Sequence, residues 1–521
     1  MKALLNKIDG INDKQLNKVF AFTLAAIIIL DCDEYLYPFF QNIHLPLPST
    51  ILTFIWLPLF CLLVFYRKEK NKKKVITGAL LLGIVYGVYF IFHHLNSRGM
   101  MDTLILPDNF YYSLYQEISY YLRMLIPLVY IYVIYKLNLD TNTFENIVIM
   151  ISIMISVPIL VTNIFTCSPS TYEGWTKANL FTWFFGIYDT YTPRQIATCF
   201  FFSEGNTTGM MMFMTYPILL NVTRKRNMDW RMIVLLVIQG LAMYCLATRV
   251  ATYGVLLMLI AYLGVYFVCL IFKKVEWNKK MLIVYLALVA LFAAIFPFSP
   301  AYVNQGINYE NDWYVLENES WRKELRDGMD QREDLIPWTQ EYIWYWAHVF
   351  EDYHFFLTFP SVYYLKFYSY KFDPKFWVDM IFEYDFYDRN SGRDAEIIFT
   401  KYKWAQLSDK QKFWGMTWSI PMEGGIVIEQ DFVSQYYTHG LIGAFLMCSP
   451  WILLLVFVIA MALKKFKKVF SIDILIFGLA YVAGLAAAYN SGHMLCEVFG
   501  SIFLAGLLAK LLRMVTEEKV A

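Results

Sequence analysis

The stretch ATYGVLLMLIAYLGVYFVCLIF, residues 251–272, contains no charged side chain and is followed directly by Lys273 and Lys274. A helix of about 20 apolar residues, rising about 1.5 Å per residue, crosses the roughly 30 Å of hydrocarbon in a bilayer. This stretch therefore predicts a transmembrane helix with a positively charged end.

Similar apolar stretches recur along the chain, which has 521 residues, 58% of them hydrophobic and only 17% charged. A soluble core cannot bury so much apolar surface. Hydropathy predicts about twelve spans, near residues 18–40, 49–66, 75–93, 112–136, 145–166, 195–221, 230–247, 251–272, 279–299, 430–460, 472–489 and 492–513. We therefore predict an all-α polytopic membrane protein.

The placement of Lys and Arg predicts its orientation. They gather after every second span, in residues 67–74, 224–231, 273–280 and 464–468, and only Lys136 follows the fourth span. Because cytoplasmic loops carry an excess of Lys and Arg, both termini are expected in the cytoplasm. The lysine-rich loops fit a bacterial cytoplasmic (inner) membrane. The net charge of +1 gives no indication of nucleic acid as a partner.

Three parts are expected: a transmembrane bundle over residues 1–299, a large extracytoplasmic loop over 300–429, and C-terminal transmembrane helices over 430–521. The loop is rich in Trp, Tyr and Phe, so it is expected to fold rather than to act as a linker. Residues 334–357 and 394–412 have the length and mixed polarity of amphipathic helices resting on the outer membrane face.

Neither the cysteines nor the histidines suggest a metal. The eight cysteines show no CxxC pattern, and no His has ligand spacing with another His, Asp or Cys. We therefore expect packed cysteines, interfacial or packed histidines, no metal site and no cofactor.

Two segments before the loop carry ionisable residues at helix ends, where they are costly and so are functional candidates. In YTPRQIATCFFFSEGN, residues 191–206, Arg194 precedes a helix that contains Asn206. In ATRVATYG, residues 247–254, Arg249 lies in a tight outward turn. An anionic ligand would explain both arginines. The structural alternatives are an Arg194 that reaches the headgroups and an Arg249 that satisfies helix C-terminal carbonyls.

Two further segments lie late in and just after the loop. In DRNSGRDAEI, residues 388–397, Arg389 and Arg393 could bind phosphate oxygens or form salt bridges with neighbouring aspartates. In EQDFVSQYYTHGLIG, residues 429–443, Glu429 and Asp431 occupy a helix start, where partial desolvation favours a general base. The alternative is a pair of carboxylates that complement the helix dipole.

Taken in order, the four segments resemble the O-antigen ligase and O-antigen polymerase membrane protein family. The matching positions are Arg194 with Gly205 and Asn206, Thr248 with Arg249, Ser391-Gly392-Arg393 with Gly415, and Glu429 with Gly440 eleven positions later. The resemblance covers roughly residues 190–450 by motif. It implies a GT-C-like fold of about twelve transmembrane helices with one large, partly helical extracytoplasmic loop.

The resemblance also implies an activity. Members transfer or polymerise glycans from a polyprenyl-diphosphate carrier on the outer face of the cytoplasmic membrane, with inversion and without a metal. The partners would be this glycan donor, a glycan or lipid acceptor, and membrane lipids. Arg194, Asn206, Arg249, Arg389 and Arg393 would bind the donor.

This chain departs from the family pattern in three places. Asn206 follows Gly rather than Pro, Gly415-Met416-Thr417 lacks a second Gly, and Glu429 stands where the family has a His. Either Glu429 is the catalytic base, with Asp431 in reserve, or His439 substitutes. A transporter or flippase of lipid-linked sugars and a non-catalytic membrane scaffold remain as alternative functions.

Overall fold

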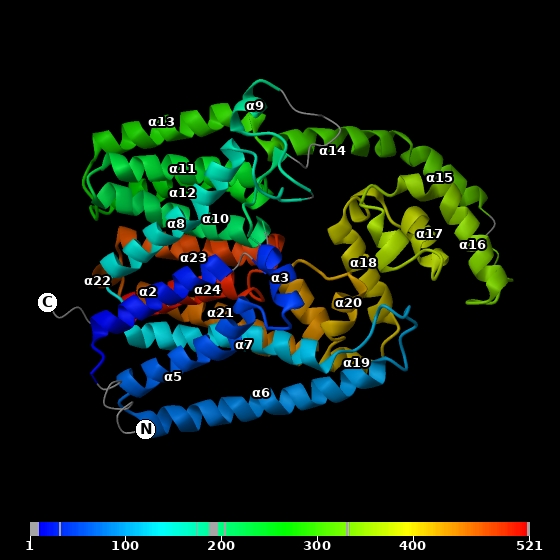
Figure 1. Cartoon of the computed structure of the whole chain (residues 1–521), viewed down its shortest axis with the longest axis horizontal. Helices are drawn as coiled ribbons and strands as arrows, with labels where there is room; N and C mark the ends of the chain where they lie inside the picture. The colour runs from blue at the N-terminus through cyan, green and yellow to red at the C-terminus, as the bar shows by residue number, and fades with distance from the viewer. Residues whose placement is uncertain are drawn as a thin grey trace. The chain divides into compact units, whose positions relative to one another are not determined.

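The computed structural model describes residues 10–30, 33–172, 174–186, 196–202, 205–329, 332 and 334–517. Throughout these residues the regular structure is helical, apart from one isolated β-bridge between Pro169 and Trp175 (Figure 1). The predicted all-α class is therefore confirmed for the part of the chain that the structure describes.

The α-helices, in chain order, are α2 (Asp13–Leu30), α3 (Asp33–Asn42), α4 (Pro48–Ile51), α5 (Leu57–Lys68), α6 (Lys72–Met100), α7 (Leu114–Leu137), α8 (Thr141–Ile164), α9 (Leu180–Phe184), α10 (Gly205–Lys225), α11 (Trp230–Leu246), α12 (Arg249–Ile271), α13 (Lys279–Ile295), α14 (Pro300–Glu317), α15 (Glu319–Gly328), α16 (Gln340–Tyr353), α17 (Pro374–Glu383), α18 (Gly392–Ala405), α19 (Asp409–Trp414), α20 (Ser419–Gly424), α21 (Asp431–Lys464), α22 (Phe466–Val469), α23 (Ile472–Asn490) and α24 (Val498–Thr516). Short π- or 3₁₀-helical turns cover Leu52–Trp56, Phe296–Phe298, His354–Phe356, Tyr363–Phe367 and Phe386–Asp388.

The chain forms two compact units. Unit 1 comprises Met1–Leu81, Leu122–Asn304 and Ser449–Ala521, and unit 2 comprises Leu82–Tyr121 and Gln305–Cys448. Most of the loop predicted over residues 300–429 thus lies in unit 2, together with residues 82–100 of α6, the start of α7 and residues 431–448 of α21. The division into residues 1–299, 300–429 and 430–521 remains a prediction.

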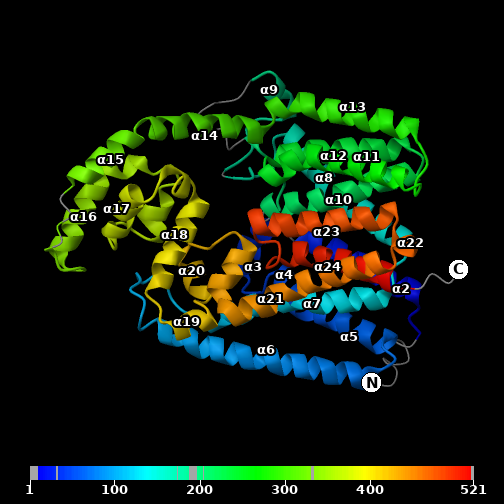
Figure 2. The same cartoon turned by 180° about the vertical axis from the view of Figure 1, so that it is seen from behind.

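Helix α10 lies at the centre of unit 1, packed against α8, α11, α12, α23 and α24 (Figures 1 and 2). Every residue from Thr207 to Thr223 is buried. Its polar side chains find partners inside the bundle: Thr215 donates to the Met211 carbonyl oxygen at 2.9 Å and accepts from Gln239 Nε2 at 2.9 Å. A central helix can therefore carry polar residues that a lipid-facing helix cannot.

Among the described residues, nine helices are long and apolar enough to cross a membrane. They are the continuous helix Pro48–Lys68, α6, α7, α8, α12, Lys279–Phe298, α21, α23 and α24. The other predicted spans correspond to α2, α10 and α11, of which α11 is a shorter apolar helix of 17 residues. The structure is therefore consistent with a polytopic membrane protein, and the figure of twelve spans remains a prediction.

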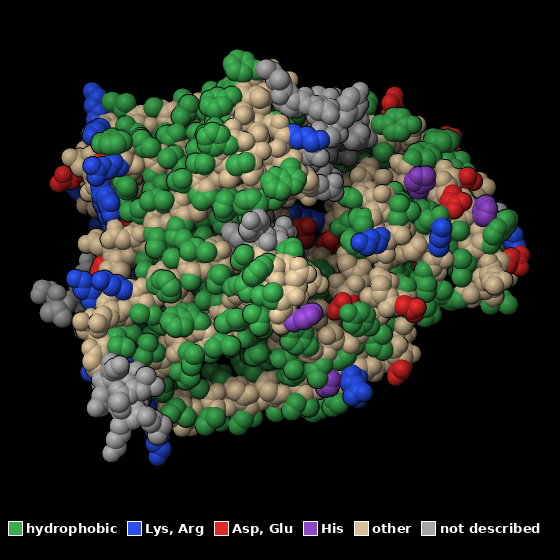
Figure 3. Space-filling view, viewed as in Figure 1, with side chains coloured by type: hydrophobic (Ala, Val, Ile, Leu, Met, Phe, Trp, Pro, Cys, Tyr) green, Lys and Arg blue, Asp and Glu red, His purple; other side chains and the backbone are tan. Residues whose placement is uncertain are grey.

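Lys and Arg side chains gather at one end of the unit 1 helices (Figure 3). This end holds the C-terminal ends of α5, α10 and α12 and the N-terminal ends of α11 and α13, which are followed or preceded by the clusters at residues 67–74, 224–231 and 273–280. One charged end is what the alternating pattern of Lys and Arg predicts. Which side of the membrane this end faces remains a prediction.

Unit 2 has its own core, built mainly from aromatic side chains. Phe350, Phe356, Tyr368, Trp377 and Phe399 are among its buried members. The long loop thus folds, as predicted, and the expected helices appear as α16 within residues 334–357 and as most of α18 and of α19 within residues 394–412. Their placement on the outer membrane face remains a prediction.

Candidate functional site

Arg393 and Glu429 form an ion pair in unit 2. Arg393 lies in the first turn of α18, whose N-cap Ser391 accepts a hydrogen bond from the Asp394 N–H. Glu429 lies in the segment without regular secondary structure that precedes α21. Arg393 Nε is 2.5 Å from Glu429 Oε2, and the side chains are 35% and 29% exposed. The two predicted site residues therefore meet at a position that solvent reaches.

Tyr363 and Glu396 extend this pair inward. The Tyr363 hydroxyl donates to Glu396 Oε1 at 2.7 Å, and Glu396 is buried. Burial, reinforced by the Glu396 and Glu429 carboxylates, raises the pKa of Tyr363, so its hydroxyl remains a donor. Gly392 lies so close to the Tyr363 ring that a Cβ atom would be 2.7 Å from the hydroxyl oxygen. Neither Tyr363 nor Glu396 was predicted as a site residue, although Glu396 is part of the segment 388–397.

Asp431, the first residue of α21, is only 2% exposed. Its buried position suits a carboxylate at a helix N-terminus. Glu429, which is partly exposed, is therefore the more accessible of the two predicted carboxylates.

Arg389 is completely buried within unit 2. Its guanidinium donates to the Tyr384 carbonyl oxygen at 3.2 Å, to the Phe356 carbonyl oxygen, and to Glu319 Oε2 at 2.7 Å. Burial lowers its pKa to about 10, and the negative charge of Glu319 opposes this effect. In this geometry the Arg389 guanidinium joins loop segments and is not accessible to a ligand.

The segments that carry Asn206 and Arg249 meet in unit 1. A Cβ atom on Gly205 would lie 3.7 Å from the Thr248 methyl group, and one on Gly209 would lie 2.6 Å from the Thr248 hydroxyl. The N-terminal ends of α10 and α12 therefore pack together, with Asn206 half-buried and Arg249 exposed. Two helix N-termini and an arginine favour an anion there. Arg194, the remaining predicted cation, lies outside the described residues.

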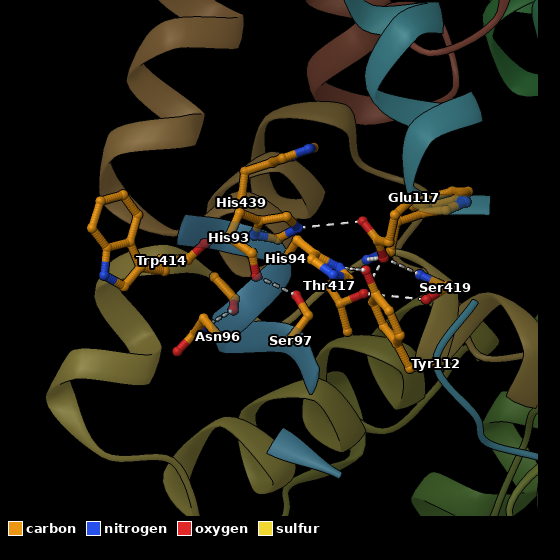
Figure 4. A network of polar contacts seen from close by, with 12 residues as sticks. His93, His94, Asn96, Ser97, Tyr112, Glu117, Trp414, Thr417, Ser419 and His439 are labelled. Atoms are coloured by element: carbon orange, nitrogen blue, oxygen red, sulfur yellow. Dashed lines mark hydrogen bonds and ion pairs between the residues drawn. The ribbon is translucent and has the colours of Figure 1, made fainter. Parts of the chain in front are cut away.

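A buried polar network in unit 2 joins α6 and α7 to the segment after α19 (Figure 4). Glu117 Oε1 accepts hydrogen bonds from the Trp418 N–H at 2.7 Å, the Ser419 N–H at 2.6 Å and the Thr417 hydroxyl. Glu117 Oε2 lies 3.3 Å from His93 Nε2. Glu117 was not predicted as a site residue, although a carboxylate within the predicted span 112–136 is energetically costly and is therefore a functional candidate.

His439 is also buried, at 1% exposure, and lies between aromatic rings. Its ring centroid is 5.5 Å from that of Tyr120 and 5.4 Å from that of His93. The expectation of a packed histidine is therefore met by His439. Its burial argues against the alternative in which it replaces Glu429 as an accessible base.

No group of three or more His, Cys, Asp or Glu residues within the described part of the chain is arranged to hold a metal ion. The cations that the sequence analysis singled out are arginines, which match phosphate geometry and stay protonated.

Comparison with protein families connects this architecture to a known group. The family model described as O-antigen ligase like membrane protein matches residues 28–518, nearly the whole chain. A search among curated proteins found no match.

Proposed function

Because the chain belongs to the family of O-antigen ligase-like membrane proteins, which are membrane enzymes acting on cell-surface polysaccharide, we propose that it transfers or polymerises a glycan from a polyprenyl-diphosphate carrier. The reaction takes place on the outer face of the bacterial cytoplasmic membrane, and both termini are cytoplasmic. Twelve spans, made by the nine long apolar helices with α2, α10 and α11, are consistent with this topology.

The proposed reaction is a single displacement. The acceptor hydroxyl oxygen attacks the anomeric carbon, the bond from that carbon to the diphosphate breaks, and the diphosphate leaves with the electron pair. The configuration at this carbon is therefore inverted. The step requires a base for the hydroxyl proton and positive charge for the departing diphosphate.

Glu429 is the proposed base, and Asp431 is its buried neighbour. In unit 2, Arg393 supplies positive charge for the departing diphosphate without a metal. The family resemblance proposes the same role for Arg194 and Arg249, and donor binding for Asn206. Arg389, which is buried against Glu319, supports the fold of the loop in this proposal.

The Arg393–Glu429 pair is the observation that carries the proposal. A phosphate group competes with a carboxylate for the same guanidinium donors. Donor binding at Arg393 would thus release Glu429 at the moment when a base is needed. The partial exposure of both side chains allows this exchange, which a fully buried pair would resist.

The test replaces the chromosomal copy in the source cells with Glu429→Gln, Arg249→Ala or Arg393→Ala. Each variant should lower the surface glycan by about a hundredfold or more and accumulate the polyprenyl-linked glycan in lipid extracts, because the base or a leaving-group cation is lost. Protein levels in the membrane should not change.

The matched control is Glu383→Gln, which breaks the Arg326–Glu383 pair, another partly exposed ion pair of unit 2. This variant should make glycan normally. Near-normal product from Glu429→Gln would remove Glu429 from the role of base.

The same extracts separate ligase from polymerase. A polymerase leaves a ladder of repeats on the lipid carrier, whereas a ligase moves the finished glycan to a different acceptor. A flippase would instead leave the donor on the cytoplasmic side when inactivated, so accessibility of the accumulated donor to an external glycosidase distinguishes that alternative.

A further inference from the structure

The segment that carries Glu429 is a closed loop. The Met416 N–H donates to the Tyr437 carbonyl oxygen at 2.7 Å, and the Thr417 N–H donates to the Thr438 carbonyl oxygen at 3.0 Å. These two bonds join the beginning and the end of residues 417–437, which we call the base loop. Glu429 lies within the base loop, so its position depends on how the loop is held.

One face of the start of α7 runs along the base loop. The Ser113 N–H donates to Ser419 Oγ at 3.1 Å, and Gln116 Nε2 donates to Glu423 Oε1 at 2.6 Å. One turn further on, the Tyr120 hydroxyl accepts a hydrogen bond from Gln435. Residues three to four apart share a face of a helix, and Glu117 lies in the middle of this face.

Glu117 makes more hydrogen bonds to the base loop than the other residues of this face. Three donors from consecutive residues, the Thr417 hydroxyl and the N–H groups of Trp418 and Ser419, converge on its Oε1 atom. Thr417 has φ of 102°, a conformation that a β-branched residue adopts only when its surroundings enforce it. Two sets of hydrogen bonds hold Thr417 in this conformation: its N–H donates to the Thr438 carbonyl oxygen, and its hydroxyl and the next two N–H groups donate to Glu117.

His93 holds Glu117 from the other side. Its Nδ1 atom lies 2.8 Å from the Trp414 carbonyl oxygen and its Nε2 atom lies 3.3 Å from Glu117 Oε2. A carbonyl oxygen only accepts, so His93 Nδ1 donates to Trp414, and this bond fixes the ring with Nε2 facing the second carboxylate oxygen of Glu117. The carboxylate is thereby fixed at both oxygens.

We infer that Glu117 is a positioning residue: through its hydrogen bonds to Thr417, Trp418 and Ser419 it holds the base loop so that Glu429 meets Arg393. This inference rests on the proposed function for its catalytic consequence. The positioning itself does not depend on that function.

In this inference, Glu117 holds the base loop by accepting hydrogen bonds, so its negative charge is not required. The amide oxygen of Gln at position 117 can accept from Trp418 and Ser419, and its NH₂ group can donate to a neutral His93 protonated at Nδ1. Ala cannot replace any of these bonds. Glu117→Gln should thus keep the conformation of the base loop, and Glu117→Ala should disrupt it. If Glu117 instead transferred a proton, both variants would lose activity.

The experiment measures hydrogen–deuterium exchange of residues 416–431 in the detergent-solubilised full chain and surface glycan in the source cells. Glu117→Ala should raise exchange of this segment by about tenfold and lower glycan by on the order of a hundredfold, since small misplacements of a catalytic group are costly. Glu117→Gln should keep wild-type exchange and glycan within about threefold of the wild type.

The matched control is Glu145→Ala, which removes another buried carboxylate, paired with Lys225 in unit 1. It should leave exchange of residues 416–431 unchanged. Wild-type exchange in Glu117→Ala, or loss of glycan in Glu117→Gln, would overturn the inference. If Glu117→Ala loosens the segment while Glu429→Gln makes normal glycan, the positioning stands and the proposed base falls.

Discussion

Lys403 is a lysine almost completely buried in unit 2. Its ammonium group donates to the Ile105 carbonyl oxygen and to the Tyr368 hydroxyl, both at 2.8 Å, and the Tyr368 hydroxyl donates to Asp373 at 2.6 Å. Burial lowers the pKa of Lys403 to about 8, and Asp373 opposes the effect. One residue thus gives this unit a pH-dependent stability.

The direction of this pH dependence follows from how many protons the folded and unfolded chains bind. The pKa of Lys403 is about 8 when folded and about 10.4 in the unfolded chain, so the unfolded chain binds more protons between these values. The free energy of unfolding should therefore rise as the pH increases through this window, by up to about 3 kcal/mol at about 1.4 kcal/mol per pKa unit.

Thermal unfolding in detergent between pH 7.5 and 9.5 measures this effect. The difference in Tm between the wild type and Lys403→Met should grow in favour of the wild type as the pH increases. Lys401→Met, which replaces an exposed lysine of the same helix, is the control and should show no such trend. A pH-independent difference for Lys403→Met would contradict the assignment.

At the scale of elements, α21 is interrupted where its backbone passes close to the backbone at Gly415. This helix is interrupted at Gly440, which has φ of 66° and ψ of −170°. A Cβ atom on Gly440 would lie 2.4 Å from the Gly415 nitrogen, and one on Gly415 would lie 2.3 Å from the Thr438 carbonyl oxygen. Both glycines belong to the motifs that resemble the family. The close contact of the two backbones explains why glycine is needed at both positions.

Gly440→Ala should therefore lower stability by about 2 kcal/mol or more, because the new methyl group meets backbone and the positive φ is strained. Gly478→Ala in α23, where a Cβ atom would meet nothing within 4 Å, should be neutral or stabilising by up to about 1 kcal/mol. Denaturant unfolding in detergent compares the two. Equal stability of both variants would show that the two backbone segments can move apart to accommodate the methyl group.

At the scale of the whole molecule, the proposed topology can be tested with a native cysteine. Cys167 directly follows the fifth predicted span, residues 145–166, which ends outside when the N-terminus is cytoplasmic. It is exposed, whereas the other described cysteines are buried or half-buried. A membrane-impermeant maleimide should label intact cells through Cys167, and Cys167→Ser should remove the label. In that background, a cysteine at Lys273 should react only after the membrane is opened. Labelling of the Lys273→Cys variant in intact cells would show that the orientation is the reverse of the proposed one.

The sequence alone determined the helical class, the approximate positions of the membrane helices and the end at which their Lys and Arg gather. These features depend on local properties, since 20 apolar residues need a hydrocarbon environment wherever the rest of the chain lies. It also indicated Arg393 and Glu429 separately, Arg393 as a possible phosphate ligand late in the loop and Glu429 as a carboxylate at a helix start.

Only the tertiary structure decided which of these residues meet. Arg393 and Glu429 are 36 positions apart and become an ion pair because α18 and the base loop fold together. Arg389, only four positions from Arg393, is instead buried against Glu319. Glu117 and Thr417 are 300 positions apart and are joined by one hydrogen bond. Burial and long-range partners are properties of the packed chain, and no local pattern of residues contains them.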